Sequence, residues 1–293
     1  MIISDYTVNL TKNILRCPIC GEPLKTDGNS MVCFNERRHT FDFSSNGYLN
    51  LAPFRGNTGD SKEAVAARHK FLLTEAYHDI ADGLNTIINK YIAQNGFIID
   101  AGCGEGYYTE RIASNGSYSV CGFDLSKYGC DVAAKSAKRN NIHNVFYAVA
   151  NIYDLPVNDK TADCVFNVFA PCAFKEFGRV LKNGGYLIVI GAGENHLIDL
   201  KKLIYDNVYT NTERDDLPTE SDGFKQVERV KVSYRRVIEG NDNIKCLFSM
   251  TPYFWRTAEQ DKRKLDAINN LETMIEAEII VYKYNDKEQG ELS

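Results

Sequence analysis

Short apolar segments alternate with helix-length amphipathic stretches through the middle of the chain. The apolar segments are rich in Val, Ile and Phe and are predicted strands; they lie at 97–100, 119–124, 145–149, 163–169 and 186–190. This alternation is typical of a parallel sheet with helices on both faces. We therefore predict a doubly wound α/β fold, with a helix at 108–113 directly after the first of these strands.

The amino-terminal part of the chain lacks this pattern. Residues 17–53 are rich in turn-forming and aromatic residues and show little helical periodicity, as expected when a metal stabilises a domain too small for its own core. The Gly-rich polar stretch 54–59 is a predicted linker, and Asp60 or Ser61 can cap the helix that follows. We predict two domains, 1–58 and 59–293.

The carboxyl-terminal part departs from the alternation in another way. Strand-like runs at 227–238 and 278–284 flank a charged predicted helix at 258–274. An antiparallel hairpin at the edge of the sheet would account for the two runs. The polar segment 211–223 is predicted to be a mobile loop.

Composition narrows the class of protein. The chain of 293 residues is 44% hydrophobic and 25% charged, which is ordinary for a globular protein. It has no apolar run near the roughly 18 residues of a membrane span and no export leader at 1–10, so we expect a cytoplasmic protein that does not contact a membrane. The nine cysteines are odd in number, which favours reduced thiols over disulfides.

Charge limits how the protein could bind nucleic acid. A net charge of -5 argues against a protein that coats nucleic acid nonspecifically, because such binding requires many neutralised phosphates. Lys and Arg residues do cluster at 127–139 and at 225–236. We interpret both clusters as solvated faces in preference to binding patches.

Three cysteines and one histidine near the start have metal-ligand spacing. Cys17 and Cys20 form a C-x2-C turn, and Cys33 with His39 can complete a tetrahedral site. Thiolates with one imidazole favour zinc, and four protein ligands leave no open position, so the ion would be structural. The five residues between Cys33 and His39 leave open that another residue replaces His39.

A glycine-rich loop follows the first predicted strand. Asp100 precedes Gly102, Gly104 and Gly106, and glycine at these positions lets the backbone turn sharply and approach a ligand. Asp124 ends the next predicted strand, where its carboxylate can accept hydrogen bonds from both hydroxyls of a ribose. Together these residues predict a site for an adenosine-containing cofactor.

The acidic residues of this loop discriminate between cofactors. A pyrophosphate at the helix N-terminus would be repelled by Glu105, whereas Glu105 and Asp100 suit the sulfonium and ammonium of S-adenosylmethionine. Asn151 and Ile152, after the third strand, are placed to contact the adenine. The alternative for these two is that they end a strand and touch no ligand.

Motifs spread over nearly the whole chain resemble those of the bacterial 23S ribosomal RNA guanine-N1 methyltransferases, including enzymes linked to tylosin resistance. They are CPIC from Cys17, FDFSSNGYLNL from Phe41, GDSKEAVAAR from Gly59, GCGEGYYT from Gly102, APC from Ala170, HLIDLKKLIY from His196 and MTPYFWR from Met250. The resemblance implies a zinc-binding RNA-recognition domain followed by a seven-stranded, Rossmann-like methyltransferase domain. It also implies methylation of N1 of one guanine in a hairpin loop of 23S rRNA, by two chains paired as a homodimer around an RNA cleft.

The resemblance also implies roles for individual residues. It assigns the zinc ligands to Cys17, Cys20, Cys33 and His39, although the family spacing of the last pair is shorter by two residues. It assigns cofactor contacts to Tyr77, Gly106, Tyr107 and His196. His196 follows the fifth strand, at the edge where open α/β sheets bind ligands, so proton acceptance is its second possible role.

The segment 167–172 follows the fourth predicted strand, where related enzymes present the target base. Asn167 could hydrogen-bond the guanine edge, and Phe169 could stack on the ring. As the alternative, Phe169 belongs to the core. Trp255 and Arg256 are further candidates for RNA contact.

Two rival functions remain. One is a small-molecule methyltransferase of the quinone-synthesis type, which would lack the zinc site. The other is a noncatalytic RNA-binding protein, against which the intact glycine loop and Asp124 argue.

Overall fold

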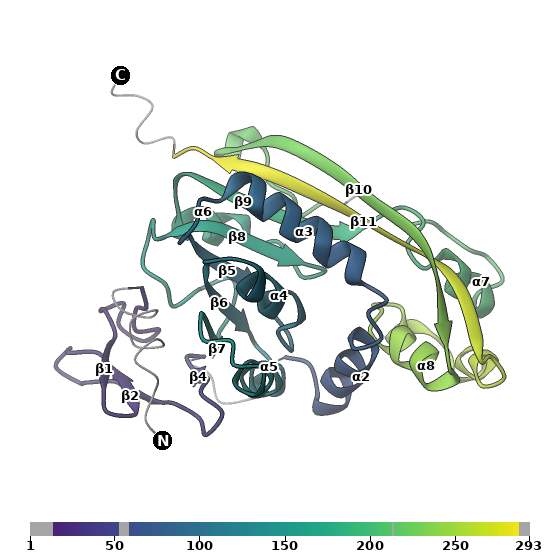
Figure 1. Ribbon diagram of the computed structural model, residues 1–293, viewed down its shortest axis with the longest axis horizontal. Helices are drawn as coiled ribbons and strands as arrows, with labels where there is room; N and C mark the ends of the chain where they lie inside the picture. The colour runs from purple at the N-terminus through teal and green to yellow at the C-terminus, as the bar shows by residue number, and fades with distance from the viewer. Residues whose placement is uncertain (1–13, 53–58, 213, 287–293) are drawn as a thin grey trace.

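The computed structural model describes residues 14–52, 59–212 and 214–286. It contains a small antiparallel sheet, ordered β1-β2-β3, and a large sheet, ordered β10-β11-β9-β8-β5-β6-β7-β4 (Figure 1). The strands are β1 Lys25–Asp27, β2 Ser30–Val32, β3 Thr40–Asp42, β4 Leu49–Asn50, β5 Phe97–Ala101, β6 Ser119–Asp124, β7 Val145–Val149, β8 Ala162–Val168, β9 Leu181–Ala192, β10 Phe224–Glu239 and β11 Asn270–Tyr284.

The five strands predicted in the middle of the chain are β5 to β9, and they are neighbours in the large sheet. They pair in parallel, and every residue of β5 and β7 is buried, as expected of strands covered on both faces. The predicted doubly wound α/β fold is confirmed. Seven strands of the sheet follow residue 59, and the short β4 adds an eighth from the amino-terminal part.

Helices lie on both faces of the large sheet, and the amino-terminal part packs beside α6 on one of them. The helices are α2 Lys62–Leu72, α3 His78–Tyr91, α4 Tyr107–Asn115, α5 Lys127–Arg139, α6 Phe174–Val180, α7 Ile198–Ile204, α8 Asn241–Ser249 and α9 Glu259–Lys262. Side chains of α3, α4, α5, α7 and α8 form one core with the sheet, and α6 joins Leu15, Leu24 and Met31 in a second core on the opposite face. None of the helices in the described residues is long and apolar enough to cross a membrane.

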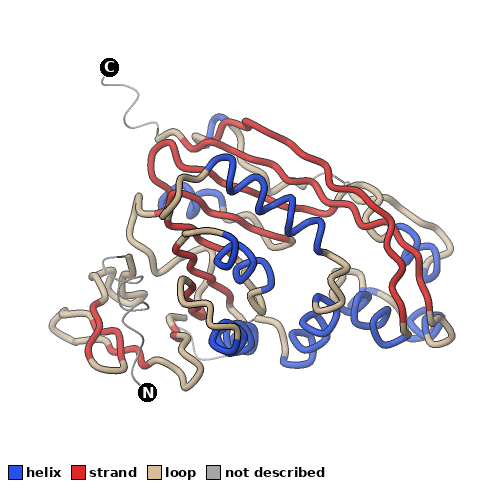
Figure 2. Tube along the Cα trace, viewed as in Figure 1, coloured by secondary structure: helices blue, strands red, loops and turns tan. Residues whose placement is uncertain are grey.

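The amino-terminal part, residues 14–52, is called the zinc module below; it consists of strands and loops (Figure 2). Its carboxyl end is bonded to the large sheet, and its amino end is bonded to the loop after β7. Leu49 and Asn50 pair in parallel with β7, and the Arg16 amide donates to the Pro156 carbonyl at 3.0 Å. Residues 54–58 of the predicted linker 54–59 lie outside the described residues, and the domain division at residue 58 stays a prediction. Ser61 caps α2 by accepting a hydrogen bond from the Ala64 amide.

The long hairpin of β10 and β11 forms the edge of the sheet, as predicted. The predicted helix at 258–274 is wrong: α9 has four residues, the 3-10 turn Arg263–Leu265 follows, and β11 begins at Asn270. Residues 270–274 pair with β10 as part of β11, and this pairing outweighs the helical pattern of the sequence. The basic cluster on β10 faces acidic partners on β11, with Lys231 to Glu276 at 2.8 Å and Arg235 to Glu272 at 2.7 Å.

Candidate active site and metal centre

All four predicted metal ligands converge in the zinc module. Their ligand atoms lie within 4.8 Å of one another. The Cys20 and Cys33 sulfurs are 3.7 Å apart, and the His39 Nδ1 lies 3.5 Å from the Cys17 sulfur and 3.4 Å from that of Cys33. Zinc bonded at about 2.3 Å to sulfur and about 2.0 Å to nitrogen requires tetrahedral edges of about 3.8 Å and about 3.5 Å. The residues therefore fit a structural zinc ion.

The position of His39 explains why its unusual spacing is tolerated. Cys33 directly follows β2 and His39 directly precedes β3, and these strands pair with each other. The Cys33 amide also donates to the His39 carbonyl at 3.1 Å. Because both ligands stand at the base of one hairpin loop, extra residues within the loop leave the ligand positions unchanged.

The glycine-rich loop connects β5 to α4 in a conformation that needs its glycines. Gly102, Gly104 and Gly106 have φ angles of 92°, 52° and 81°, in the left-handed region. A Cβ on Gly102 would meet the Ala170 Cβ at 2.7 Å, and one on Gly106 would meet the Tyr147 hydroxyl at 2.6 Å. The glycines are thus required by the sharp turn and by the close packing of Ala170 and Tyr147, and the loop, called the cradle below, lies at the carboxyl ends of the strands, where open α/β sheets bind ligands.

Two aspartates border this cradle. The Asp124 carboxylate accepts from the amides of Gly104 (3.0 Å) and Ser126 (2.7 Å), and it keeps lone pairs for further donors. Asp100 is buried and accepts from the Thr109 hydroxyl at 2.5 Å. Burial raises the pKa of Asp100 to about 8 and also raises that of Asp124.

Glu105 is placed differently from what the sequence argument assumed. Its carboxylate is buried and pairs with the Arg68 Nε at 2.7 Å, and Arg68 also pairs with Asp60. The negative charge of Glu105 is therefore balanced by Arg68 on α2, and the carboxylate does not point at a ligand. Sequence reasoning missed Arg68, although it lies within the GDSKEAVAAR motif.

Three aromatic side chains from distant segments meet beside the cradle. The Phe169 ring stacks on that of His196, with centroids 5.6 Å apart and planes 26° apart, and its centroid lies 6.0 Å from that of Tyr77. The Tyr77 hydroxyl lies 3.1 Å from the His196 Nε2. Tyr77 and His196 are buried, but Phe169 is 40% exposed, so the prediction that it could belong to the core is not met.

The hydrogen bonds of His196 define its protonation. Its Nδ1 accepts from the Glu276 amide at 3.1 Å, so the proton of the neutral ring is on Nε2 and faces Tyr77. Burial lowers the pKa of His196 to about 4. Both ring nitrogens are thus engaged, which favours a role in shaping the site over proton acceptance.

Asn167 lies beneath the site. It is fully buried, and its Nδ2 donates to the carbonyls of Ala101 at 2.7 Å and Pro171 at 3.1 Å. It therefore joins the glycine loop to the loop after β8. In this arrangement the amide nitrogen of Asn167 is already bonded to two backbone carbonyls and is not free to donate to a guanine.

The other predicted cofactor residues lie at the rim. Tyr107 begins α4, its hydroxyl donates to Glu75 at 3.3 Å, and the Arg111 guanidinium covers its ring at 3.6 Å. Asn151 and Ile152 follow β7, next to the end of β6 that carries Asp124. The Asn151 side chain caps its own turn by accepting from the Tyr153 amide at 3.1 Å.

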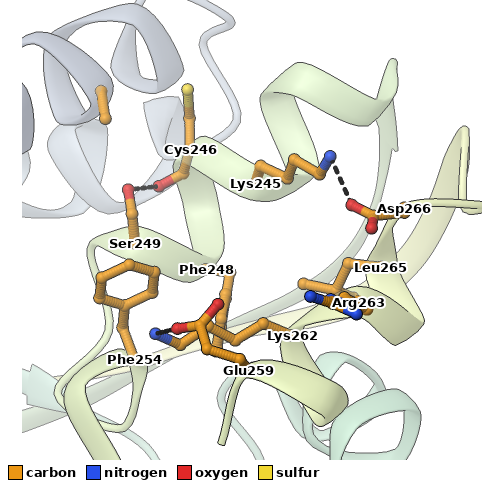
Figure 3. Close-up of a pocket in the computed structure, with 11 residues that line it drawn as sticks. Lys245, Cys246, Phe248, Ser249, Phe254, Glu259, Lys262, Arg263, Leu265 and Asp266 are labelled. Atoms are coloured by element: carbon orange, nitrogen blue, oxygen red, sulfur yellow. Dashed lines mark hydrogen bonds and ion pairs between the residues drawn. The ribbon is translucent and has the colours of Figure 1, made fainter. Parts of the chain in front are cut away.

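A separate cavity of about 450 Å³ lies between α2, α8 and the segment before β11 (Figure 3). Phe248, Phe254 and Leu265 are among its apolar lining residues, and the ion pairs Lys245–Asp266 and Lys262–Glu259 stand at its rim. It contains none of the predicted site residues. Trp255 is 78% exposed beside it.

Comparisons with known proteins agree with this arrangement. A family model described as "Methyltransferase domain" matches residues 99–189, and one described as "RlmA, N-terminal", a zinc ribbon, matches residues 15–57. The "23S rRNA (guanine(748)-N(1))-methyltransferase" of Streptomyces fradiae is 31% identical over 65% of this chain and 69% of that protein. The "Putative 23S rRNA (guanine-N(1)-)-methyltransferase YxjB" of Bacillus subtilis is 28% identical over 92% of this chain and 96% of that protein.

These matches confirm the resemblance seen in the motifs, and they cover both the zinc ligands and the glycine loop. The chain therefore belongs to the 23S rRNA (guanine-N1)-methyltransferase family, as an S-adenosylmethionine-dependent enzyme with a zinc ribbon in its amino-terminal part.

Proposed function

We propose that this protein methylates N1 of one guanine in a hairpin loop of 23S rRNA. The names of its relatives support the reaction. The observation that carries the proposal is Phe169, an exposed aromatic ring beside the cofactor cradle. The zinc module argues against a small-molecule methyltransferase, and the intact cradle argues against a noncatalytic protein.

The backbone at Phe169 supports a functional role for its ring. Phe169 has a φ of 52°, a conformation that costs a bulky residue on the order of 1–3 kcal/mol. Such strain persists where the surrounding contacts enforce it and is concentrated at functional sites. Guanine N1 lies on the Watson–Crick edge, so the target base must be unpaired, and an exposed ring offers it a stacking surface.

The remaining residues orient the reaction. When bound, S-adenosylmethionine would supply the activated methyl group: the N1–methyl bond forms as the sulfur–methyl bond breaks, S-adenosylhomocysteine leaves with that bonding pair, and the N1 proton is released to water. We assign Asp124 to the ribose hydroxyls and the backbone of Gly102, Gly104 and Gly106 to the close approach of the cofactor. Neutral His196 adds no positive charge beside a sulfonium. Holding the base and the cofactor in line can supply most of the rate acceleration of a displacement.

The zinc module offers a second aromatic surface for RNA. Phe34 is 66% exposed, with the Lys25 ammonium 5.5 Å and the Arg38 guanidinium 6.0 Å from its ring centroid. An exposed ring flanked by cations suits an unpaired base and its phosphate. We assign RNA recognition by the module to this group.

A cytoplasmic location and the pairing of two chains around the RNA complete the proposal, and the family resemblance supports both. Sedimentation of the protein with and without an rRNA hairpin tests the pairing. A monomer under both conditions contradicts it.

Incubation with labelled methyl donor and 23S rRNA from a strain deleted for this gene tests the function. We expect label in the RNA and a new reverse-transcriptase stop at one guanine, because N1 methylation blocks pairing. Phe169→Ala should abolish most of the transfer, and Phe169→Trp, which keeps a stacking ring, should retain more of it. Transfer to a small acceptor but none to RNA would falsify the proposal.

A further inference from the structure

The loop after β8 is held from the side by two residues of the segment that was predicted to be mobile. The Arg214 Nη2 donates to the Ala170 carbonyl at 2.9 Å. The Asp216 Oδ2 accepts from the Cys172 amide at 2.7 Å. Arg214 and Asp216 also pair with each other through two contacts of 2.7 and 2.6 Å. This arginine–carboxylate bracket thus holds one carbonyl and one amide of the loop.

The bracket complements two other restraints on the same loop. Asn167 holds the Pro171 carbonyl from below at 3.1 Å, and the Phe169 amide donates to the Ile190 carbonyl at 2.9 Å. The backbone polar groups from Phe169 to Cys172 are therefore fixed on several sides. Several hydrogen bonds on one short segment can hold a bulky residue in a left-handed backbone conformation.

The bracket keeps its charge at neutral pH. Hydrogen bonding from Arg214 holds the pKa of Asp216 below its usual range. Arg214 also lies close to β9, since a Cβ on Gly191 would meet its Cδ at 3.0 Å. The side chain is thus seated against the sheet and is not a freely moving surface group.

We propose that Arg214 and Asp216 are positioning residues that set the loop Phe169–Cys172 and thereby aim the Phe169 ring at the target base. The expected effect of the bracket on methyl transfer rests on the proposed function. Its structural part, the ordering of the loop, does not depend on the substrate. Neither residue needs to touch RNA or cofactor.

The chain contains a matched control. Arg179 and Glu176 form a bracket of the same chemistry on the loop after β7: Arg179 donates to the carbonyls of Leu155 (3.0 Å) and Val157 (2.8 Å). Glu176 accepts from the Leu155 amide at 2.6 Å and pairs with Arg179. None of these contacts involves the Phe169 loop.

The test compares Asp216→Ala, Asp216→Asn and the control Glu176→Ala. Amide hydrogen exchange in the protein without RNA should accelerate within 170–173, at the amides of Ala170, Cys172 and Ala173, in Asp216→Ala and not in Glu176→Ala. With rRNA, Asp216→Ala should lower kcat by about tenfold, the loss expected for a charge-assisted hydrogen bond, and leave cofactor affinity within about twofold. Asp216→Asn keeps an acceptor for the Cys172 amide, so its kcat should fall less.

The outcomes separate this inference from the proposed function. Wild-type protein that methylates no rRNA contradicts the function, and exchange at 170–173 then still decides on the bracket. Unchanged exchange in Asp216→Ala overturns the inference. A fall in kcat that Glu176→Ala reproduces at equal stability overturns it as well, because it would reflect general loosening.

Discussion

The zinc module and the parallel part of the large sheet are stabilised by different means. In β5 and β7 every side chain is buried, and the strands pair with neighbours on both sides. The module has three strands of three residues each, the two-residue strand β4 and one cluster of four ligand atoms. Metal coordination therefore adds to the burial of residues such as Leu24 and Met31 in holding its loops, whereas the loops of the sheet are held by burial and hydrogen bonds.

This difference changes what an exposed aromatic ring requires. In the module, Phe34 is exposed in a loop between two ligands, Cys33 and His39, and the left-handed residue of that loop is Arg38, with a φ of 39°. In the sheet, Phe169 is displayed by a left-handed backbone that its neighbours must enforce. In the sheet the exposed ring itself carries the left-handed backbone, whereas in the module a neighbouring residue of the loop carries it.

Removal of zinc should give the largest loss of structure, and this loss should be confined to the zinc module. Cys17→Ser should lose the ion and unfold the loops of the module, because structural zinc contributes about 10–16 kcal/mol of apparent binding free energy in small zinc domains. Metal analysis and amide hydrogen exchange over 14–52 measure this. Cys246→Ser, outside the cluster, is the control. Full zinc content in Cys17→Ser refutes the ligand assignment.

Loss of the Asp124 carboxylate should affect cofactor binding at the large sheet and leave the zinc module intact. Asp124→Ala should weaken cofactor binding by about 10- to 100-fold, the range for hydrogen bonds to a charged group, with zinc content unchanged. Calorimetric titration of S-adenosylhomocysteine measures the affinity. An affinity within twofold of the wild type would show that the ribose is held elsewhere.

The two exposed rings should separate binding from catalysis. Phe169→Ala should lower kcat, because the base is no longer stacked beside the cofactor. Phe34→Ala should raise the KM for RNA by up to about tenfold and leave kcat near the wild-type value. Steady-state kinetics on one rRNA fragment compares them directly. If both variants change only KM, Phe169 is merely another RNA contact.

The smallest effect concerns pH, for which the two regions should respond in opposite directions. Burial raises the pKa of Asp100 to about 8, so the stability that its protonated form contributes is complete below about pH 4 and is lost as pH rises towards 8. Zinc binding strengthens over the same range, because its thiols must lose protons. Asp100→Asn should raise the Tm of the cofactor-free protein by a few degrees at pH 8 and little at pH 5. A Tm difference that is equal at both pH values contradicts the buried-acid interpretation.

The sequence predicted those features that depend on local pattern. The apolar runs located β5 to β9 within a few residues, and the alternating glycines located the cradle, because each follows from its own segment. The helix at 258–274 was wrong because Leu271, Thr273 and Ile275 are buried by pairing with β10, a partner more than 30 residues away. Arg214 and Asp216 gave no signal, since their role depends on a loop about 45 residues earlier in the chain.

The attachment of the module to the sheet has a consequence for target choice. Backbone hydrogen bonds join Leu49–Leu51 to β7 and Arg16 to the Pro156 carbonyl in the loop after β7, so both ends of the module are attached near the same edge of the fold. If Phe34 and Phe169 bind the RNA as proposed, these attachments determine how far from Phe34 the methylated nucleotide lies. Relatives that modify a neighbouring guanine should differ at these two attachments while keeping the same methyl-transfer residues.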